Sequence, residues 1–343
     1  MTDRADFLRR AGAGAAGLSL AGLLGPGAAL AGGGGGGDFP AHPRWRFVFV
    51  SYDTLDPLLV ASQFGAEDAA SLVNCAIQWT GSANGSVAET VSALRKAVAG
   101  KADGIAVAVV DPQVFIAPIA AAVKAKIPVV AFHVDVGRIP SIGFAGENPS
   151  ASGLAVAAEV VRLVPRSSVL LFVPQRAPAW IARRALAVTG GLSTAAAGGT
   201  VTRVLLGGDV GRQQAQVENA YRSRTGIRGL VAVDGTGTLA VARAIKNLGL
   251  QGKVRAGGWD LLPDDLAYVA DGTLDFVVDQ GPYLQGFAPV VQLFLAKISE
   301  GIVSPAVAET SGLLRKADVA TFLATKSRFE GSSSRHEYPL RRA

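Results

Sequence analysis

Polar and aromatic side chains end three apolar runs in the second half of the chain. "VAVD" ends at Asp234, "GGWD" ends at Trp259 and Asp260, and "DFVVDQ" ends at Asp279 and Gln280. A carboxylate can accept hydrogen bonds from two neighbouring hydroxyls, and an aromatic face covers the apolar C–H side of a sugar ring. These residue types at strand ends therefore predict a site for a polyhydroxylated ligand.

The same residues also have structural interpretations. Asp234 and Asp260 each precede a helix pattern and could cap it, and Trp259 could belong to the core. Residues 235–240 read G-x-G-x-x-A after a strand, a pattern typical of dinucleotide binding, with Asp260 where a ribose-binding acid would stand. Asp234, however, would face the pyrophosphate with like charge. We therefore expect a ligand contact from Asp234 and no nicotinamide cofactor.

Further candidates follow the apolar runs of the first half. Asp56 could also cap a helix, Asp135 could stabilise a turn, and His133 could be a satisfied core residue. Because ligands bind beyond the carboxyl ends of parallel strands, we keep all of them as candidate contacts. They are Tyr52, Asp53, Asp56, His133 and Asp135.

The segment "PQRAPAWIARRAL", residues 174–186, brings arginines and a tryptophan to a predicted helix start. The rigid fork of arginine recognises hydroxyls and carboxylates. Three arginines within nine residues cannot all face one pocket. Trp180 and Arg184 share a helix face, and Arg183 lies beside it. The spacing leaves open which of Arg183 and Arg184 faces the ligand.

Patterns for catalysis and metal binding are missing. The sequence has no G-x-S-x-G, no S-x-x-K with its partners and no H-E-x-x-H, and its three histidines and single cysteine, Cys75, are scattered. We therefore predict no catalytic residue, no metal site and no cofactor.

The positive charge of the chain is concentrated near its two ends. The 343 residues carry a net charge of +6, of which +1 falls in residues 1–31 and +3 in residues 326–343, leaving +2 for the rest. No dense basic face remains, which argues against a nucleic-acid partner.

The elements that position these residues alternate between apolar strand patterns and helix patterns. Most strand patterns are continuous rather than alternating, as in parallel strands covered on both faces. About nine strands are too many for one small sheet, so we predict α/β structure with two doubly wound parallel sheets. The ranges are 46–51, 75–80, 104–110, 128–134, 168–173, 200–206, 229–233, 254–259 and 275–279, with "SIGFAG" at 141–146 between the two groups.

The amino-terminal segment predicts export. Residues 1–31 have a basic start, a short apolar stretch broken by Pro26 and a small-residue end, the plan of a secretory signal peptide. The glycine-rich residues 32–44 form the predicted leader to the mature protein. Residues 326–343 are predicted to be a flexible tail.

Several segments together resemble the periplasmic sugar-binding proteins of the ribose-binding type. "PVVAFHVD", "GENPSASGLAVA", "VAVDGTGTLAVARAI" and "GGWDLLPDDLAYVADGTLDFVVDQGPYLQGFAPV" carry the resemblance, which extends over residues 46–325. It implies two lobes joined by three crossing segments, a type I periplasmic binding fold. The implied lobes are residues 45–146 with 281–311, and residues 147–280 with 312–325.

The resemblance also implies roles for individual residues. Gln280 matches a glutamine at the cleft and hinge, and Asp260 matches an aspartate after a Gly-aromatic pair. His133 stands where Asp or Asn is usual, and Arg183 lies beside the usual arginine position. The candidate ligand contacts are thus Tyr52, Asp53, Asp56, His133, Asp135, Trp180, Arg183, Asp234, Trp259, Asp260 and Gln280.

From these observations we predict a non-enzymatic, monomeric, exported protein of the periplasm or cell-surface space. It would bind a neutral sugar or polyol between its lobes and deliver it to the permease of an ABC importer. The main alternative is a sugar-responsive receptor or regulator with the same core. A regulator would need a DNA-binding segment before residue 46, where the sequence has a signal-like stretch and six glycines.

Overall fold

The computed structural model describes residues 40–319, except residues 136, 138, 196–199, 262 and 302–306. The predicted signal peptide, most of the predicted leader and the predicted tail lie outside these ranges. The described residues contain two six-stranded sheets, each with helices packed on both faces. We call each sheet with its helices a lobe, numbered by the sheet that begins first along the chain.

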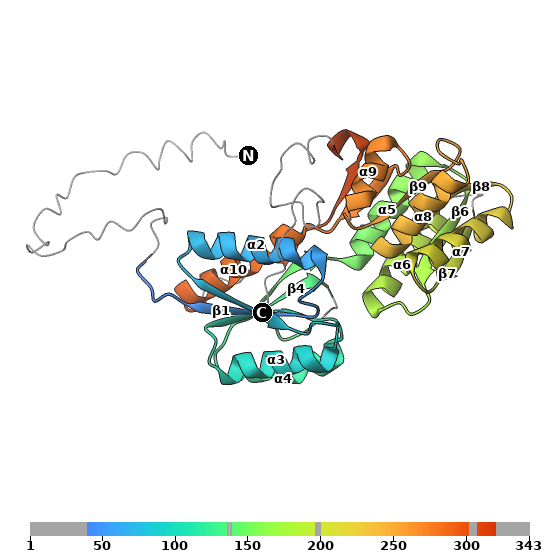
Figure 1. Cartoon of the computed structure of the whole chain (residues 1–343). Coiled ribbons are helices and arrows are strands. Elements are labelled where there is room, and N and C mark those ends of the chain that lie inside the picture. Colours follow the sequence, from blue (N-terminus) through green and yellow to red (C-terminus); the bar gives the residue numbers. More distant parts are fainter. Residues whose placement is uncertain are drawn as a thin grey trace, which may run out of the picture. The chain divides into compact units, whose positions relative to one another are not determined.

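The first lobe has the strand order β11-β5-β4-β3-β1-β2, and all its strands are parallel. Helices α2 and α10 pack on one face of this sheet, and α3 and α4 pack on the other (Figure 1). The elements are β1 (Arg46–Ser51), α2 (Pro57–Leu72), β2 (Ala76–Gly81), α3 (Val87–Ala99), β3 (Gly104–Ala108), α4 (Pro112–Lys124), β4 (Val129–Val134), β5 (Gly143–Glu147), α10 (Pro282–Ile298) and β11 (Val307–Glu309).

The second lobe has the strand order β12-β10-β9-β8-β6-β7. Its strands are parallel except for the edge strand β12, which runs antiparallel to β10. Helices α5 and α6 cover one face, and α7, α8 and α9 cover the other. The elements are α5 (Pro149–Leu163), β6 (Ser168–Pro174), α6 (Ala179–Ala195), β7 (Val201–Leu206), α7 (Val210–Arg222), β8 (Ile227–Ala232), α8 (Gly235–Asn247), β9 (Arg255–Trp259), α9 (Pro263–Asp271), β10 (Phe276–Asp279) and β12 (Gly312–Arg315).

Burial on both faces explains the continuous apolar runs. In β1, Phe47 and Phe49 pack toward α2 and α10, while Val48 and Val50 pack toward α3 and α4. Successive side chains of a strand point to opposite faces, so a sheet covered on both sides needs every position to be apolar. The predicted fold class is thereby confirmed.

The chain passes between the lobes three times. It leaves β5 at Glu147 for α5, leaves β10 at Asp279 for α10, and leaves β11 at Glu309 for β12. In the second crossing, Gly281 has a φ of 63°, and a Cβ there would lie 2.3 Å from the carbonyl oxygen of Thr310 in the third. Only glycine fits this close approach of two crossings.

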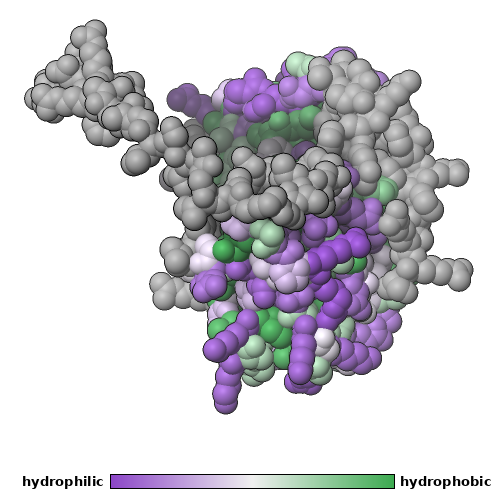
Figure 2. Space-filling model, turned by 90° about the vertical axis from the view of Figure 1, so that its left-hand side faces the viewer, coloured by the Kyte–Doolittle hydropathy of each residue, from purple (hydrophilic) through white to green (hydrophobic). Residues whose placement is uncertain are grey.

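The surface facing the viewer in Figure 2 mixes hydrophilic side chains with smaller hydrophobic patches. Within the described ranges, no helix combines the length and the apolar character that a membrane span requires.

Candidate ligand-binding site

A cavity of about 310 Å³ is lined by residues at or just after the carboxyl ends of strands in both lobes, and by residues at the start of α6. Its volume falls at the small end of the range typical of ligand pockets, about 300–1,000 Å³. Parallel sheets place their ligand sites at this edge. The lining residues are Tyr52, Asp56, His133, Pro174, Arg176, Pro178, Trp180, Ile181, Arg184, Asp234, Asp260 and Gln280.

Three aromatic rings form one wall of the cavity. The Tyr52 ring stacks on His133, with ring centroids 5.1 Å apart, and meets Trp180 of the second lobe edge-on at 6.4 Å. The Tyr52 hydroxyl donates to Asp56 Oδ2 at 3.0 Å. Burial, together with the positive charge of Arg184, lowers the pKa of His133 to about 4. This wall is therefore uncharged at neutral pH.

Two carboxylates stand at the amino terminus of α8. Asp234 caps this helix, with its Oδ1 accepting from the Gly237 amide at 3.1 Å. Asp260, at a φ of 78°, accepts from Gln280 Nε2 on its Oδ1. The other oxygen of Asp260 lies so close to Gly235 that a Cβ there would be 2.7 Å away. Both side chains keep lone pairs with which they can accept hydroxyls.

The helix terminus favours negative charge, but burial opposes it. Burial and the neighbouring Asp260 charge raise the pKa of Asp234 to about 6. Burial also raises the pKa of Asp260, although Arg184 and Gln280 act in the opposite direction. We therefore expect the acceptor strength of the cavity to change with pH near 6.

One of the two arginines that line the cavity, Arg184, is buried in α6. Its Nε donates to Glu147 Oε1 at 2.9 Å, and its Nη2 donates to Glu147 Oε2 and to Gln280 Oε1. Glu147 is itself fully buried and is not among the residues that line the cavity. Burial alone would raise the pKa of Glu147, but the charge and hydrogen bonds of Arg184 hold it below its usual value.

Four predicted contacts lie outside the cavity lining, namely Asp53, Asp135, Arg183 and Trp259. Asp53 accepts from the Leu55 amide, and Asp135 accepts from the Gly137 amide, so each stabilises a local turn. Trp259 is fully buried, and its indole N–H donates to Glu147 Oε1 at 2.9 Å. The sequence predicted that the Trp259 ring would contact the ligand. In the structure the ring instead packs in the core of the second lobe.

The structure places the two arginines that the sequence left open in different surroundings. Arg184 lines the cavity, whereas Arg183 donates from Nη1 to the Asp135 carbonyl oxygen at 3.2 Å. Arg184 stands one turn after Trp180, so both side chains face the cavity. Sequence reasoning did not single out Glu147. The available signal was a carboxylate directly before the helix cap Asn148, at the end of an apolar strand.

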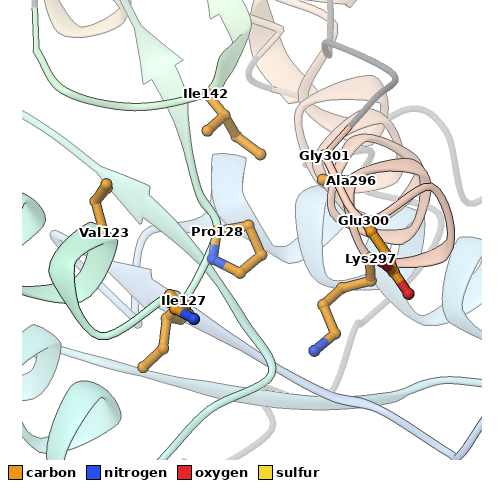
Figure 3. A pocket seen from close by; sticks show the side chains of 9 residues that line it. Val123, Ile127, Pro128, Ile142, Ala296, Lys297, Glu300 and Gly301 are labelled. Atoms are coloured by element: carbon orange, nitrogen blue, oxygen red, sulfur yellow. The ribbon is translucent and has the colours of Figure 1, made fainter.

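A second cavity, of about 370 Å³, lies in the first lobe (Figure 3). Its lining comes from the end of α4, the residues before β4 and β5, and the end of α10, including Ile127, Ile142 and Lys297. These positions precede the strands, so the cavity lies at the edge of the sheet opposite the candidate site. Its lining offers fewer polar groups and none of the predicted contacts.

Comparison with known proteins gives a consistent result. Residues 47–298 match the family described as periplasmic binding protein domain. The chain is 33% identical over 318 residues to the xylose/arabinose-binding protein XylF of Sulfolobus acidocaldarius, covering 88% of this chain and 78% of that protein.

Solved structures of sugar-binding proteins share the fold. The arabinose-binding protein AraP of Geobacillus stearothermophilus matches with a TM-score of 0.70 at 22% identity, covering 82% of this chain and 99% of that one. A carbohydrate transporter protein of Acidothermus cellulolyticus, in complex with myo-inositol, matches with a TM-score of 0.69 at 21% identity, covering 84% and 100%. The fold and site define a two-lobed binding protein. The chain belongs to the periplasmic binding protein family, as its sequence predicted.

Proposed function

We propose that this protein is an exported solute-binding protein. It captures a neutral sugar or polyol between its lobes and delivers it to an ABC importer without chemical change. The observation that carries the proposal is the cavity itself, where carboxylate acceptors, arginine donors and aromatic rings from both lobes converge. The similarity to a xylose/arabinose-binding protein supports a sugar as the ligand.

Each group in the cavity has a role suited to a sugar. Asp234 and Asp260 accept hydrogen bonds from ring hydroxyls, and Arg184 and Arg176 donate to hydroxyl or ring oxygens. The rings of Tyr52 and Trp180 cover the C–H face. The carboxylates also disfavour anionic ligands, because a sugar acid or sugar phosphate would face like charges at reduced dielectric.

Binding requires the two lobes to act together. Tyr52, Asp56 and His133 come from the first lobe, while most of the remaining lining comes from the second. A ligand that contacts both sets favours the arrangement in which they face each other, which is hinge closure. We propose that the lobes are residues 45–146 with 281–311, and residues 147–280 with 312–325; the placement of β11 in the first sheet and β12 in the second supports this division.

The partners follow from the family and from the sequence. A binding protein of an ABC importer works with a permease in the membrane, and the signal-like residues 1–31 support its export. We propose that the protein acts as a monomer and binds no nucleic acid, because its net charge falls largely outside residues 32–325.

The dinucleotide alternative is weakened by the position of two carboxylates. The amino terminus of α8, where a pyrophosphate would lie, holds Asp234 and Asp260. Like charges there would repel a phosphate.

A ligand screen tests the proposal. Thermal unfolding of the purified protein is measured with D-xylose, L-arabinose, D-arabinose, D-allose and myo-inositol, and hits are confirmed by calorimetry. Glucuronate, ribose 5-phosphate and NAD⁺ are the controls. At least one neutral ligand should raise the Tm, because binding to the native state stabilises it. A response to the anionic compounds alone, or to none, would overturn the proposal.

A further inference from the structure

Arg184 lines the cavity but donates four hydrogen bonds to other protein groups. Its guanidinium carries five N–H donors in a fixed plane. Nε and Nη2 donate three hydrogen bonds, two to Glu147 and one to Gln280, and Nη1 donates one to the Val233 carbonyl oxygen at 3.2 Å. Within the described ranges, one N–H of Nη1 is left for a ligand.

The Glu147 carboxylate is held by three hydrogen-bond donors from different residues. Its Oε1 accepts from Arg184, from the Trp259 indole at 2.9 Å and from the Ser152 hydroxyl at 2.5 Å. The guanidinium carbon of Arg184 also lies 5.3 Å from the centre of the Trp259 ring. The carboxylate and the indole therefore determine both the plane and the rotation of the arginine.

The same carboxylate lies where the chain leaves the first lobe. Glu147 is the last residue of β5 and begins the first crossing, while Gln280 lies in the second crossing and also donates to Asp260. The Gln280 carbonyl oxygen accepts from Thr310 Oγ1 of the third crossing at 2.6 Å and from Gln285 Nε2 at 2.8 Å. One polar network thus connects the cavity wall to all three crossings.

We infer that Glu147 is a positioning residue for sugar binding: it holds Arg184 so that the remaining Nη1–H is presented to the ligand, and it ties that contact to the first crossing. The inference rests on the proposed function. Its physical basis is preorganisation, since an arginine ordered before binding loses little side-chain freedom when the ligand arrives. A freely rotating arginine would have to be ordered by the ligand itself.

The chain provides a matched control for this role. Glu159 in α5 is also buried and accepts from two arginines, Arg162 and Arg315. It does not line the cavity. Glu147→Gln and Glu159→Gln both remove the charge of a buried carboxylate that accepts hydrogen bonds from arginine. Both should lower the Tm, and only the first should change ligand affinity.

The experiment compares the Kd for D-xylose or D-arabinose by calorimetry in the parent and in these two variants, with folding checked by circular dichroism. Glu147→Gln should bind about tenfold more weakly, because a hydrogen bond to a charged group loses its fixed geometry. Glu159→Gln should stay within about twofold of the parent, as expected for an independent site. A Kd for folded Glu147→Gln within about twofold of the parent would overturn the inference.

Two further measurements test the inference if Glu147→Gln does not fold or if the parent protein binds neither sugar. Ser152→Ala removes one donor to Glu147 and keeps the charge, so it should weaken binding about threefold; parent-like affinity would contradict the role. By NMR, the Arg184 Nε–H, assigned by its loss in Arg184→Lys, should exchange slowly in the ligand-free parent and faster in Ser152→Ala. A fast-exchanging parent signal would refute the positioning, even if the parent bound no sugar and the proposed function failed.

Discussion

Asp234 and Asp260 share one helix terminus, and this proximity sets the chemistry of the cavity at the scale of single residues. Asp234 caps α8 through the Gly237 amide, and Asp260 lies against Gly235 one position away. Burial makes both carboxylates harder to ionise, while the helix terminus and Arg184 favour the charged form. A protonated carboxyl group has lost part of its capacity to accept hydroxyls.

We predict that sugar affinity falls as the pH drops through about 6, because burial and Asp260 raise the pKa of Asp234 to about that value. Calorimetry at pH 5, 6, 7 and 8 should give the weakest binding at pH 5. His133 is mostly neutral over this range, since burial and the charge of Arg184 lower its pKa to about 4. Asp234→Asn should bind weakly at every pH. Asp209→Asn, which alters a comparable cap on α7, should keep the parent profile.

Folding stability of the ligand-free protein should change in the opposite direction. Burial raises the pKa of Asp234 and of Asp279 to about 6, so between their usual values and pH 6 the native state holds more protons than the unfolded chain. Stability from these groups therefore rises as the pH falls from 7 toward 4. Affinity that also rises toward pH 5 would contradict the assignment of ionised acceptors.

Replacing Asp260 by alanine should remove most of the binding. The change deletes a carboxylate that accepts from Gln280 and faces the cavity, so affinity should fall by about 100-fold or more. Calorimetry with the best ligand of the screen measures it. Asp264→Ala, at an exposed residue of α9, is the control and should bind like the parent. Equal affinities for the two variants would remove Asp260 from the site.

At the scale of elements, the apolar patterns were strongly informative because both sheets are covered on both faces. Every predicted strand range overlaps an observed strand. The short edge strands β11 and β12 have three and four residues, too few to give a pattern. The strand-end rule placed Tyr52, Asp234 and Gln280 at one cavity.

The rotation of a helix about its axis was harder to predict. Arg183 and Arg184 are equally plausible from spacing, and the packing of α6 against α5 and the sheet brings Arg184 to the cavity. The same packing places Trp259 in the core. Glu147 escaped notice because its partners, Arg184 and Trp259, are 37 and 112 positions away in the sequence.

The close approach of two crossings gives a prediction at this scale. Gly281→Ala would bring a Cβ to within 2.3 Å of the Thr310 carbonyl oxygen and place alanine at a φ of 63°. Gly249→Ala is the matched control, because it has a φ of 61° and open space around it. The control should lose about 1–2 kcal/mol of unfolding free energy, and Gly281→Ala should lose more. Urea unfolding measures both, and equal losses would mean that the crossing tolerates displacement.

At the scale of the whole molecule, Gln280 connects the candidate cavity to the segments that cross between the lobes, so we expect it to couple ligand binding to lobe closure. It contacts Arg184 and Asp260 through its side chain and Thr310 through its backbone. Gln280→Ala should weaken binding about tenfold or more. It should also reduce the sugar-induced decrease in the radius of gyration, measured by small-angle scattering at saturating ligand. A variant that binds weakly but contracts fully would separate the two roles.

The order of the elements along the chain has a consequence for biosynthesis. One face of the first sheet, with Phe47 and Phe49, is covered partly by Val290, Leu293 and Phe294 of α10. Helix α10 is synthesised only after strands β6–β10 of the second lobe. The first strands of the chain therefore lack part of their core until nearly all of the described residues have been synthesised. A nascent chain stopped before α10 would expose large aromatic side chains and depend on a chaperone to stay soluble.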